Sequence, residues 1–367
     1  MKVTIINCFD VYDRRVELLR ASLRGEGHRV SVLVPNFRHM QRCRRTHCPA
    51  GFEMLPVIPY YGRFSPARIR SHMRFARDAL YRAEELRPDL LWVLVPPNSL
   101  VREAALYRKR RPDMRLVLDF MDLWPESMPV PGFASTPPGC LWQGLRDRYA
   151  DGADIVVTES SKYWAVLQKS CEKKKLHTLF VPRKDGFRYL EAHPPRDRIA
   201  LCFLGQVNGD IDFQAVGRLL QRMGQAAELH VIGAGDGETM LRRTVEDAGA
   251  RVEFHGKVYA PEKKRRIFER CHAGLNLLRN GPRSGLSMKS VDYLEASLPV
   301  INNVPGDTWD FIERYPVGLN CDGSMEVTAS KLLALQSRRE QIQAVYHTYF
   351  AERVFSTNLR KIMGAER

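Results

Sequence analysis

The chain alternates between two spacings of its apolar positions. An apolar run at 3–9 is followed by apolar residues at helical spacing, Val16, Leu19 and Leu23, and then by a second apolar run at 29–34. Short apolar runs are typical of buried strands, and the spacing between them is that of a helix with one apolar face. Strand, helix and strand in this order form a βαβ unit, which requires the two strands to be parallel.

The same order is repeated along the rest of the chain. Further strands are predicted at 90–95, 115–120, 154–159, 179–182, 199–204, 229–232, 273–278 and 298–301. Helices are predicted at 67–88, 101–110, 213–223 and 261–271, from about 287, and once or twice within 340–363. The polar stretch 183–198 has two consecutive prolines and no period, so we place a domain boundary there. The stretch 36–66 is predicted to be a long irregular loop.

Length and composition agree with two globular domains. A chain of 367 residues is longer than one ordinary core, and no stretch approaches 18 uninterrupted apolar residues. We therefore expect a cytoplasmic protein that does not span a membrane.

The eight cysteines have no framework spacing and are expected to be reduced thiols. The cluster His39, Cys43, His47 and Cys48 matches no zinc pattern, and we expect no metal site.

The charge of the chain changes this picture, because it points to anionic partners. The net charge is +15, and residues 1–150 hold 25 Lys and Arg against 15 Asp and Glu. The predicted helix 67–88 carries much of this excess as arginines: Arg68, Arg70, Arg74, Arg77 and Arg82. Its polar face is either simply solvated or lies against an anionic membrane surface. No nucleic-acid-binding module is recognisable, so no specific nucleic acid is expected.

The stretch 279–304 holds the strongest candidate for a binding site. A polar loop containing Gly285 leads into a helix that begins near Ser287 and carries Lys289. The first amides of a helix lack partners within the helix and attract anions, phosphate above all. Glu295 lies six residues beyond Lys289, hence on another face, where a carboxylate would suit ribose hydroxyls. The alternative is that Lys289 and Glu295 are ordinary solvated residues.

Residues 285–301 resemble the donor-nucleotide motif of retaining glycosyltransferases of the two-domain GT-B fold, family 4. In that family two glutamates flank seven residues: Glu295 matches the second, which binds ribose, and Ser287 replaces the first, which touches the transferred sugar. The run Asp122-Leu123-Trp124-Pro125 is similar to that of bacterial members that build surface polysaccharide of the capsule or O-antigen type.

The resemblance implies a fold and a domain plan. The fold class is α/β, with two Rossmann-like doubly wound domains facing across a cleft. An acceptor-binding domain would occupy 1–190 and a donor-binding domain 197–340. The C-terminal helix, at about 345–367, would cross back to the first domain.

The resemblance also implies an activity. The chain would move a sugar, with retention, from a nucleotide diphosphate donor, UDP-linked by preference, to a glycan or a polyprenyl-diphosphate-linked oligosaccharide. The nucleotide sugar is a co-substrate, and no cofactor or metal is expected. The protein would act in surface polysaccharide biosynthesis as a peripheral protein at the inner face of the membrane.

The site residues follow from the motifs and from the ends of the predicted strands, where ligands of parallel sheets bind. The catalytic candidates are Asp122, Lys289 and Glu295. The donor-binding candidates are Gly205, Gln206, Asn208, Gly233, His255, Gly256, Lys257, Arg283, Gly285, Leu286, Ser287 and Met288. The acceptor-binding candidates are Asp10, Tyr12, Asp13 and Glu126. Gln206 and Asn208 stand where the family has an arginine and a lysine, which leaves the pyrophosphate to Arg283 and Lys289.

Two other functions fit the same residues. The absence of the first glutamate, at Ser287, would suit a non-catalytic partner subunit that binds an anionic membrane or another polyanion. A nucleotide-sugar epimerase of the same fold is the third hypothesis.

Overall fold

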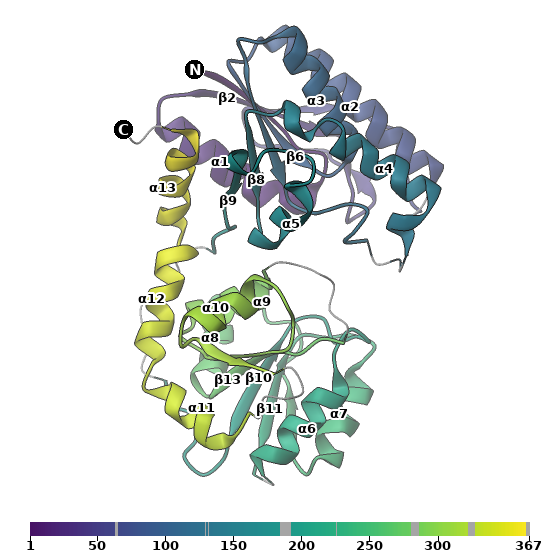
Figure 1. Cartoon of the computed structure of the whole chain (residues 1–367). Helices are drawn as coiled ribbons and strands as arrows, with labels where there is room; N and C mark the ends of the chain where they lie inside the picture. Colours follow the sequence, from purple (N-terminus) through teal and green to yellow (C-terminus); the bar gives the residue numbers. More distant parts are fainter. Residues whose placement is uncertain are drawn as a thin grey trace. The chain divides into compact units, whose positions relative to one another are not determined.

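The structure is a computed structural model, and it describes residues 1–62, 65–128, 130, 132–183, 192–224, 226–279, 286–321 and 327–364. The chain divides into two compact units (Figure 1). The first unit contains Met1–Val181 together with Phe355–Arg367, and the second contains Pro182–Val354. Each unit is built on its own parallel sheet.

The sheet of the first unit has the strand order β5-β2-β1-β6-β7-β8-β9, with every pair parallel. Its strands are β1 (Lys2–Ile6), β2 (Arg29–Pro35), β5 (Phe52–Leu55), β6 (Leu90–Val95), β7 (Arg115–Phe120), β8 (Ile155–Thr158) and β9 (Leu176–Thr178). Its helices are α1 (Asp13–Gly25), α2 (Pro66–Leu86), α3 (Asn98–Arg110), α4 (Pro137–Asp147), α5 (Trp164–Leu167) and most of α13 (Glu352–Met363). A short antiparallel hairpin, β3 (Phe37–Arg38) with β4 (Cys43–Arg44), lies outside this sheet.

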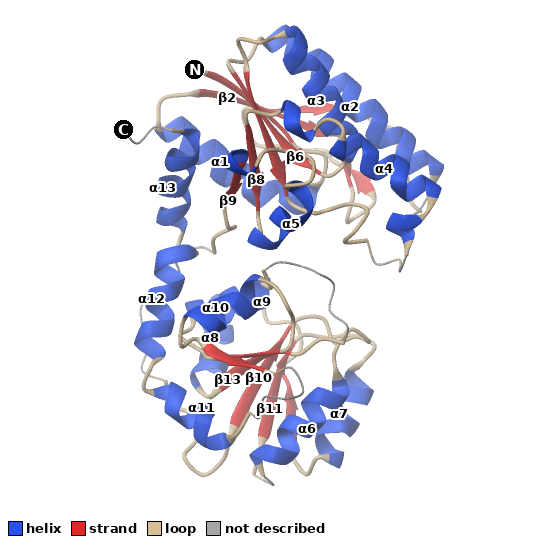
Figure 2. Ribbon diagram, viewed as in Figure 1, coloured by secondary structure: helices blue, strands red, loops and turns tan. Residues whose placement is uncertain are grey.

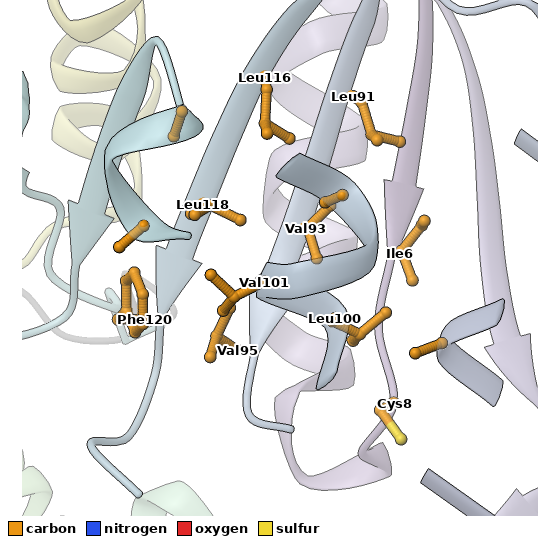
Figure 3. Close-up of a cluster of buried hydrophobic side chains, with 14 of the residues drawn as sticks. Ile6, Cys8, Leu91, Val93, Val95, Leu100, Val101, Leu116, Leu118 and Phe120 are labelled. Carbon is orange, nitrogen blue, oxygen red and sulfur yellow. The ribbon is translucent and has the colours of Figure 1, made fainter. Parts of the chain in front are cut away.

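Both faces of the first sheet are buried, which explains why its strands are apolar without interruption. Successive side chains of a strand point to opposite faces. In β6, Leu91 and Val93 join the core that α2 and α3 cover, whereas Trp92 and Leu94 join the core that α1 and α13 cover. Figure 3 shows the first of these cores, where Leu100 and other residues of α3 pack on the strands.

The sheet of the second unit has the order β12-β11-β10-β13-β14-β15, again all parallel. Its strands are β10 (Ala200–Leu204), β11 (Glu228–Ile232), β12 (Arg251–Phe254), β13 (Ala273–Asn276), β14 (Val300–Asn302) and β15 (Gly318–Asn320). Its helices are α6 (Phe213–Met223), α7 (Glu238–Asp247), α8 (Pro261–Glu269), α9 (Met288–Glu295), α10 (Asp307–Arg314), α11 (Ala329–Gln336) and α12 (Arg339–Tyr349), coloured blue beside the red strands in Figure 2.

The predicted fold class is confirmed in its main features. Two parallel α/β units are present, and the last helix packs on the first of them through Phe355, Leu359 and Ile362. The stretch 36–66 is less irregular than predicted, because it contains the edge strand β5 and the β3–β4 hairpin. The strand predicted at 179–182 lies earlier, at Leu176–Thr178.

Two further observations bear on expectations from composition. Among the described residues, no helix combines the length and the apolar character needed to cross a bilayer. No disulfide joins any of the eight cysteines, all of which lie in the described part of the chain.

A buried ion pair ties α1 to the first sheet. Arg15 donates from Nε and Nη2 to the two carboxylate oxygens of Asp119 on β7, over 2.8 and 2.7 Å, and both side chains are buried. Trp92 Nε1 donates to the same carboxylate over 2.9 Å. The guanidinium of Arg15 also donates to the Leu179 carbonyl and lies over the ring of Phe355 in α13. Asp119 therefore holds the sheet and its covering helices together.

We expect Asp119→Ala to lower the free energy of unfolding by about 3–5 kcal/mol, because it leaves the Arg15 guanidinium buried without its anion. Urea unfolding measures this loss. The matched control is Arg74→Ala, which removes a largely exposed pair with Asp78 and should cost about 0.5 kcal/mol or less. Equal losses in the two variants would contradict the role given to Asp119.

Candidate functional site

The strand order of the second sheet defines where a ligand is expected. Strand β10 is central, with β11 and β13 as its neighbours, so the chain leaves β10 toward one side and returns on the other. At such a switch point the loops after β10 and β13 run to opposite sides of the sheet. A crevice then opens beyond the carboxyl ends of these two strands. The loop after β10 borders this position, and the loops after β11 and β12 lie on one side of it.

These loops are packed backbone against backbone. The amide of Gly205 donates to the Ile232 carbonyl over 2.9 Å, and the amide of Gly233 donates to the Gly256 carbonyl over 2.8 Å. A Cβ on Gly233 would lie 1.8 Å from the Gly205 carbonyl oxygen, and one on Gly235 would lie 2.0 Å from that of Val207. Only glycine fits at positions 233 and 235. This close backbone packing explains why the turn after β11 is rich in glycine.

A cavity of about 480 Å³ lies on these loops. Of the predicted donor-binding residues, Gly205, Gln206, Gly233 and Lys257 line it. The remaining lining residues, apart from Tyr259, are Leu204, Ile232, Ala234, Gly235 and Val258, which are glycine or aliphatic residues. The ring of Tyr259 completes the rim and is 84% exposed, so it is open to stacking by a flat ligand. The sequence analysis did not select Tyr259.

Lys289 reaches the same loops from α9. Its Nζ lies 4.6 Å from the centroid of the Phe203 ring, and a Cβ on Gly205 would be 3.7 Å from this Nζ. Lys289 forms no ion pair with the described residues. Burial lowers the pKa of its ammonium to about 8, and the charge of Asp210 opposes this shift. A cation whose charged form is disfavoured by desolvation is a ready partner for an anion.

The start of α9 is held by a row of buried asparagines. Asn276, Asn302 and Asn320 end β13, β14 and β15, and their side-chain amides are hydrogen-bonded in sequence over 2.6 and 3.0 Å. Ser287, the residue before α9, donates from Oγ to Asn276 Oδ1 over 3.1 Å. The row fixes the place where α9 begins. The sequence analysis missed it, although an asparagine at the end of each strand was a visible signal.

Glu295 does not share the surroundings of Lys289. It is the last residue of α9, only 7% exposed, and its carbonyl accepts a hydrogen bond from Gln343 of α12. Glu295 also does not line the cavity on the loops after β10, β11 and β12. The ribose contact expected for its carboxylate stays a prediction without structural support.

The remaining donor-binding candidates have mixed placements. The side-chain amide of Asn208 donates a hydrogen bond to Asp210 in the same loop over 2.9 Å. The His255 ring is hydrogen-bonded to His230 and does not line the cavity. Leu286 and Met288 flank Ser287 at the start of α9. Arg283 and Gly285 lie outside the described residues.

Three of the candidates in the first unit are at the carboxyl end of its sheet. Asp10 Oδ1 accepts from the amides of His39 and Met40 and so holds the β3–β4 hairpin. Asp122 accepts from Trp124 Nε1 over 2.9 Å. Burial raises the pKa of the Asp122 carboxyl and of the Tyr12 phenol, and the charge of Asp122 adds to the shift of Tyr12. Tyr12 and Asp122 therefore lie close together in a site of low polarity.

The other two acceptor candidates are held in ion pairs. Asp13 binds Arg45 through both carboxylate oxygens, at 3.2 and 2.9 Å. Glu126 binds the buried Arg146 in the same way, at 2.7 Å on each oxygen. These pairings argue against the acceptor role predicted for Asp13 and Glu126. Both partners are 20 or more residues away in the sequence, so local spacing could not reveal them.

A polar and aromatic cluster in the first unit was missed. The Tyr60 hydroxyl lies between two imidazoles, 2.8 Å from His39 Nδ1 and 3.2 Å from His72 Nε2. The Phe9 ring packs on both histidines, and Trp124 packs on Phe9 and His72. Burial lowers the pKa of His72 well below its usual value. The cluster joins the loop after β1 to α2 and to the predicted loop 36–66.

Comparison with solved structures identifies the fold. The lipopolysaccharide outer core galactosyltransferase WaaB in its apo form matches with a TM-score of 0.71, at 13% identity over 100% of both chains. Anabaena HepE in complex with UDP matches with a TM-score of 0.66, at 11% identity over 100% of both chains, and HepE is also solved with UDP-glucose. The N-terminal domain of Candida albicans trehalose-6-phosphate phosphatase matches with a TM-score of 0.65, at 10% identity over 100% of this chain and 97% of that one.

No family model matches the chain, and no curated protein matches it significantly in sequence. The structural neighbours confirm the expected GT-B fold. At these identities they establish the fold alone.

The lowered pKa of Lys289 predicts a dependence of stability on pH. Between pH 8 and 10.5 the unfolded chain binds a proton at this lysine that the folded chain has released, so folding becomes more favourable as the pH rises. Relative to Lys289→Met, the free energy of unfolding of the native protein should rise over this range by about 3 kcal/mol, measured by urea unfolding. The exposed Lys109 is the control, since Lys109→Met should give no such pH-dependent difference. Parallel curves for native protein and Lys289→Met would contradict burial of the ammonium.

Proposed function

We propose that the chain transfers a sugar from a UDP-linked donor to a glycan or polyprenyl-diphosphate-linked acceptor, with retention, in surface polysaccharide biosynthesis. The observation that carries this proposal is the half-buried Lys289 ammonium beside the Gly205 loop, at the switch point of a sheet in a GT-B fold, with its pKa lowered to about 8 by desolvation. A diphosphate bound there would be the counter-ion of this ammonium.

The same cation suits the chemistry of transfer. When the bond between the sugar and the diphosphate breaks, negative charge develops on the leaving oxygen. A fixed, poorly solvated cation stabilises that charge more than it stabilises the ground state. The start of α9 adds partial positive charge from its first amides. Lys289 and α9 would thus serve both donor binding and departure of the leaving group.

The cavity on the loops after β10, β11 and β12 would hold the nucleoside. It is lined mainly by glycine and aliphatic residues, with the exposed Tyr259 ring and Lys257 among its lining residues. HepE, which has the same fold, is solved with UDP and with UDP-glucose, and this favours UDP here. Ser287, whose hydroxyl is fixed by Asn276, has the sequence position of the family's first glutamate and would lie near the transferred sugar.

Retention is proposed through displacement on one face of the sugar. In this reaction the bond to the leaving diphosphate breaks while the acceptor oxygen attacks from the same side, and the acceptor proton passes to the leaving phosphate oxygen. The protein then needs no carboxylate nucleophile, and its task is to hold the acceptor hydroxyl beside the leaving phosphate on one face of the sugar.

Acceptor binding is assigned to the first unit. Asp10, Tyr12 and Asp122 lie at the carboxyl end of its sheet, and Tyr12 and Asp122 share a site of low polarity. The capsule or O-antigen type of acceptor comes from the resemblance of the Asp122–Pro125 run. A lipid-linked acceptor would place the protein at the inner face of the membrane.

Helix α2 supplies a surface for that location. Ile69, Arg70, Arg74, Arg77 and Tyr81 are exposed along one face, which combines apolar and cationic side chains. A shallow groove of about 650 Å³ follows this face and is lined by most of the same residues. Anionic headgroups would meet the guanidinium groups, and the apolar residues would enter the interface.

The substitution at Ser287 keeps a second function open. A non-catalytic partner subunit would retain the nucleotide site but not transfer sugar. Donor binding and donor turnover are therefore tested separately.

We expect UDP to bind far more tightly than uridine, and Lys289→Ala to weaken UDP binding about 10- to 150-fold while leaving uridine binding unchanged. The reason is the loss of a charge-assisted bond to phosphate, which contributes about 1.5–3 kcal/mol. Isothermal titration calorimetry measures both ligands. Lys109→Ala is the control and should bind UDP as the native chain does.

Equal losses for UDP and uridine would contradict a phosphate role for Lys289. Incubation with UDP-glucose and UDP-galactose then tests catalysis, with the anomer released by slow hydrolysis followed by NMR. An α anomer from an α-linked donor supports the proposal, and a β anomer refutes retention. UDP binding without any turnover in the presence of glycan acceptors would favour the partner subunit.

Vesicle sedimentation tests the membrane surface. Arg70→Glu/Arg74→Glu should weaken binding to vesicles containing phosphatidylserine by about 30-fold or more, because each cation contributes about 1 kcal/mol. Arg242→Glu/Arg243→Glu, an equal change of charge on α7, is the matched control and should have little effect. Equal weakening in both variants would mean that only net charge matters and that α2 is no specific surface.

A further inference from the structure

Three side chains converge on the outer strands of the second sheet. His230 on β11 and Glu253 on β12 are directly paired in register, and His255 follows two residues after Glu253. One ligand atom from each residue lies within 4.8 Å of the other two. His230 is buried, whereas the side chain of Glu253 is 56% exposed. Solvent therefore reaches the cluster from one side.

A carboxylate behind the cluster fixes the orientation of His230. Glu228 Oε1 lies 2.8 Å from His230 Nε2, and Arg198 Nε donates to the other Glu228 oxygen over 2.6 Å. The His230 proton is therefore placed on Nε2, and the lone pair of Nδ1 is directed toward His255 and Glu253. A histidine oriented by a carboxylate on its second nitrogen is the usual arrangement of a metal ligand.

A simple hydrogen bond between the two imidazoles explains only part of this geometry. His230 Nδ1 and His255 Nε2 are 3.0 Å apart, and the rings are stacked with their planes at 19°. The contact does not explain why Glu253 lies 3.3 Å from His230 Nδ1 and 3.6 Å from His255 Nδ1. Two imidazoles and one carboxylate with one open side are the ligand set of a three-coordinate protein site for zinc.

We propose that His230, His255 and Glu253 bind a divalent transition-metal ion, Zn²⁺ in the first place, with Glu228 as a positioning residue. Imidazole nitrogens favour this class of ion over Mg²⁺ and Ca²⁺. Water would fill the open position. The site does not depend on the proposed sugar transfer, and no step of that reaction is assigned to it.

The site adjoins the cavity on the loops after β10, β11 and β12. His255 directly precedes Gly256, whose carbonyl accepts the Gly233 amide, and Lys257, which lines the cavity. A metal bound to the His255 ring would restrict this turn. By linkage, any effect of the metal on nucleotide affinity must equal the effect of the nucleotide on metal affinity.

The test uses the full chain and Zn²⁺ in competition with a chromophoric chelator. We expect one Zn²⁺ per chain, loss of this binding in His255→Ala and in His230→Ala, and a 10- to 100-fold weaker affinity in Glu228→Gln. Circular dichroism of each variant confirms folding. His28→Ala is the matched control, because His28 also lies beside a carboxylate, that of Glu26, and should leave Zn²⁺ affinity unchanged.

The thiols of Cys43 and Cys48 are the competing metal-binding site. The absorption spectrum of bound Co²⁺ distinguishes these thiolate ligands from the proposed ligands. Bound to the proposed ligands, Co²⁺ should show d–d absorption without a thiolate charge-transfer band, and Cys43→Ser/Cys48→Ser should bind as the native chain does. The proposal is overturned by an absence of Zn²⁺ binding, by unchanged affinity in a folded His255→Ala chain, or by a thiolate band that disappears with the two cysteines.

Discussion

Desolvation disfavours an ammonium group unless an anion compensates it, and the pKa of the half-buried Lys289 is lowered for this reason. Its Nζ lies against the Phe203 ring and the Gly205 loop. The structure around it is organised to keep this position: the asparagine row fixes the start of α9, and glycines at 233 and 235 let two loops pack without side chains between them. An anion is the component that would make this arrangement favourable.

The fold could be predicted from the sequence because its signals are local. Strands buried on both faces appear as apolar runs, as 90–95 and 115–120 do, and the helices between them show one apolar face. Elements without such a signal were missed. Strand β5 has four residues, three of them only half-buried, at the edge of the sheet, and its pattern does not differ from that of a loop.

The candidate site could be predicted only in part, because its geometry depends on contacts between distant segments. The strand ends and the helix start indicated Gly205, Gly233 and Lys289, and the structure brings these residues to neighbouring loops, although their role in donor binding stays a prediction. The spacing on the helix could not show that Glu295 ends α9 or that α12 packs beside it, and its ribose contact stays a prediction. The Tyr60 hydroxyl contacts His39 and His72, and two of these three residues lie in a segment predicted as loop. Their positions in the sequence follow no helix or strand period, so the contacts could not be predicted.

The two units differ in how charged side chains near the carboxyl ends of their sheets are paired. In the first unit, the carboxylates of Asp13 and Glu126 are each bound by an arginine through both oxygens, so they are satisfied within the protein. In the second unit, the Lys289 ammonium has no ion-pair partner among the described residues. Burial costs of this kind are retained in proteins where a ligand offsets them. The contrast favours the second unit as the place of the proposed anion binding, on physical grounds that do not depend on family resemblance.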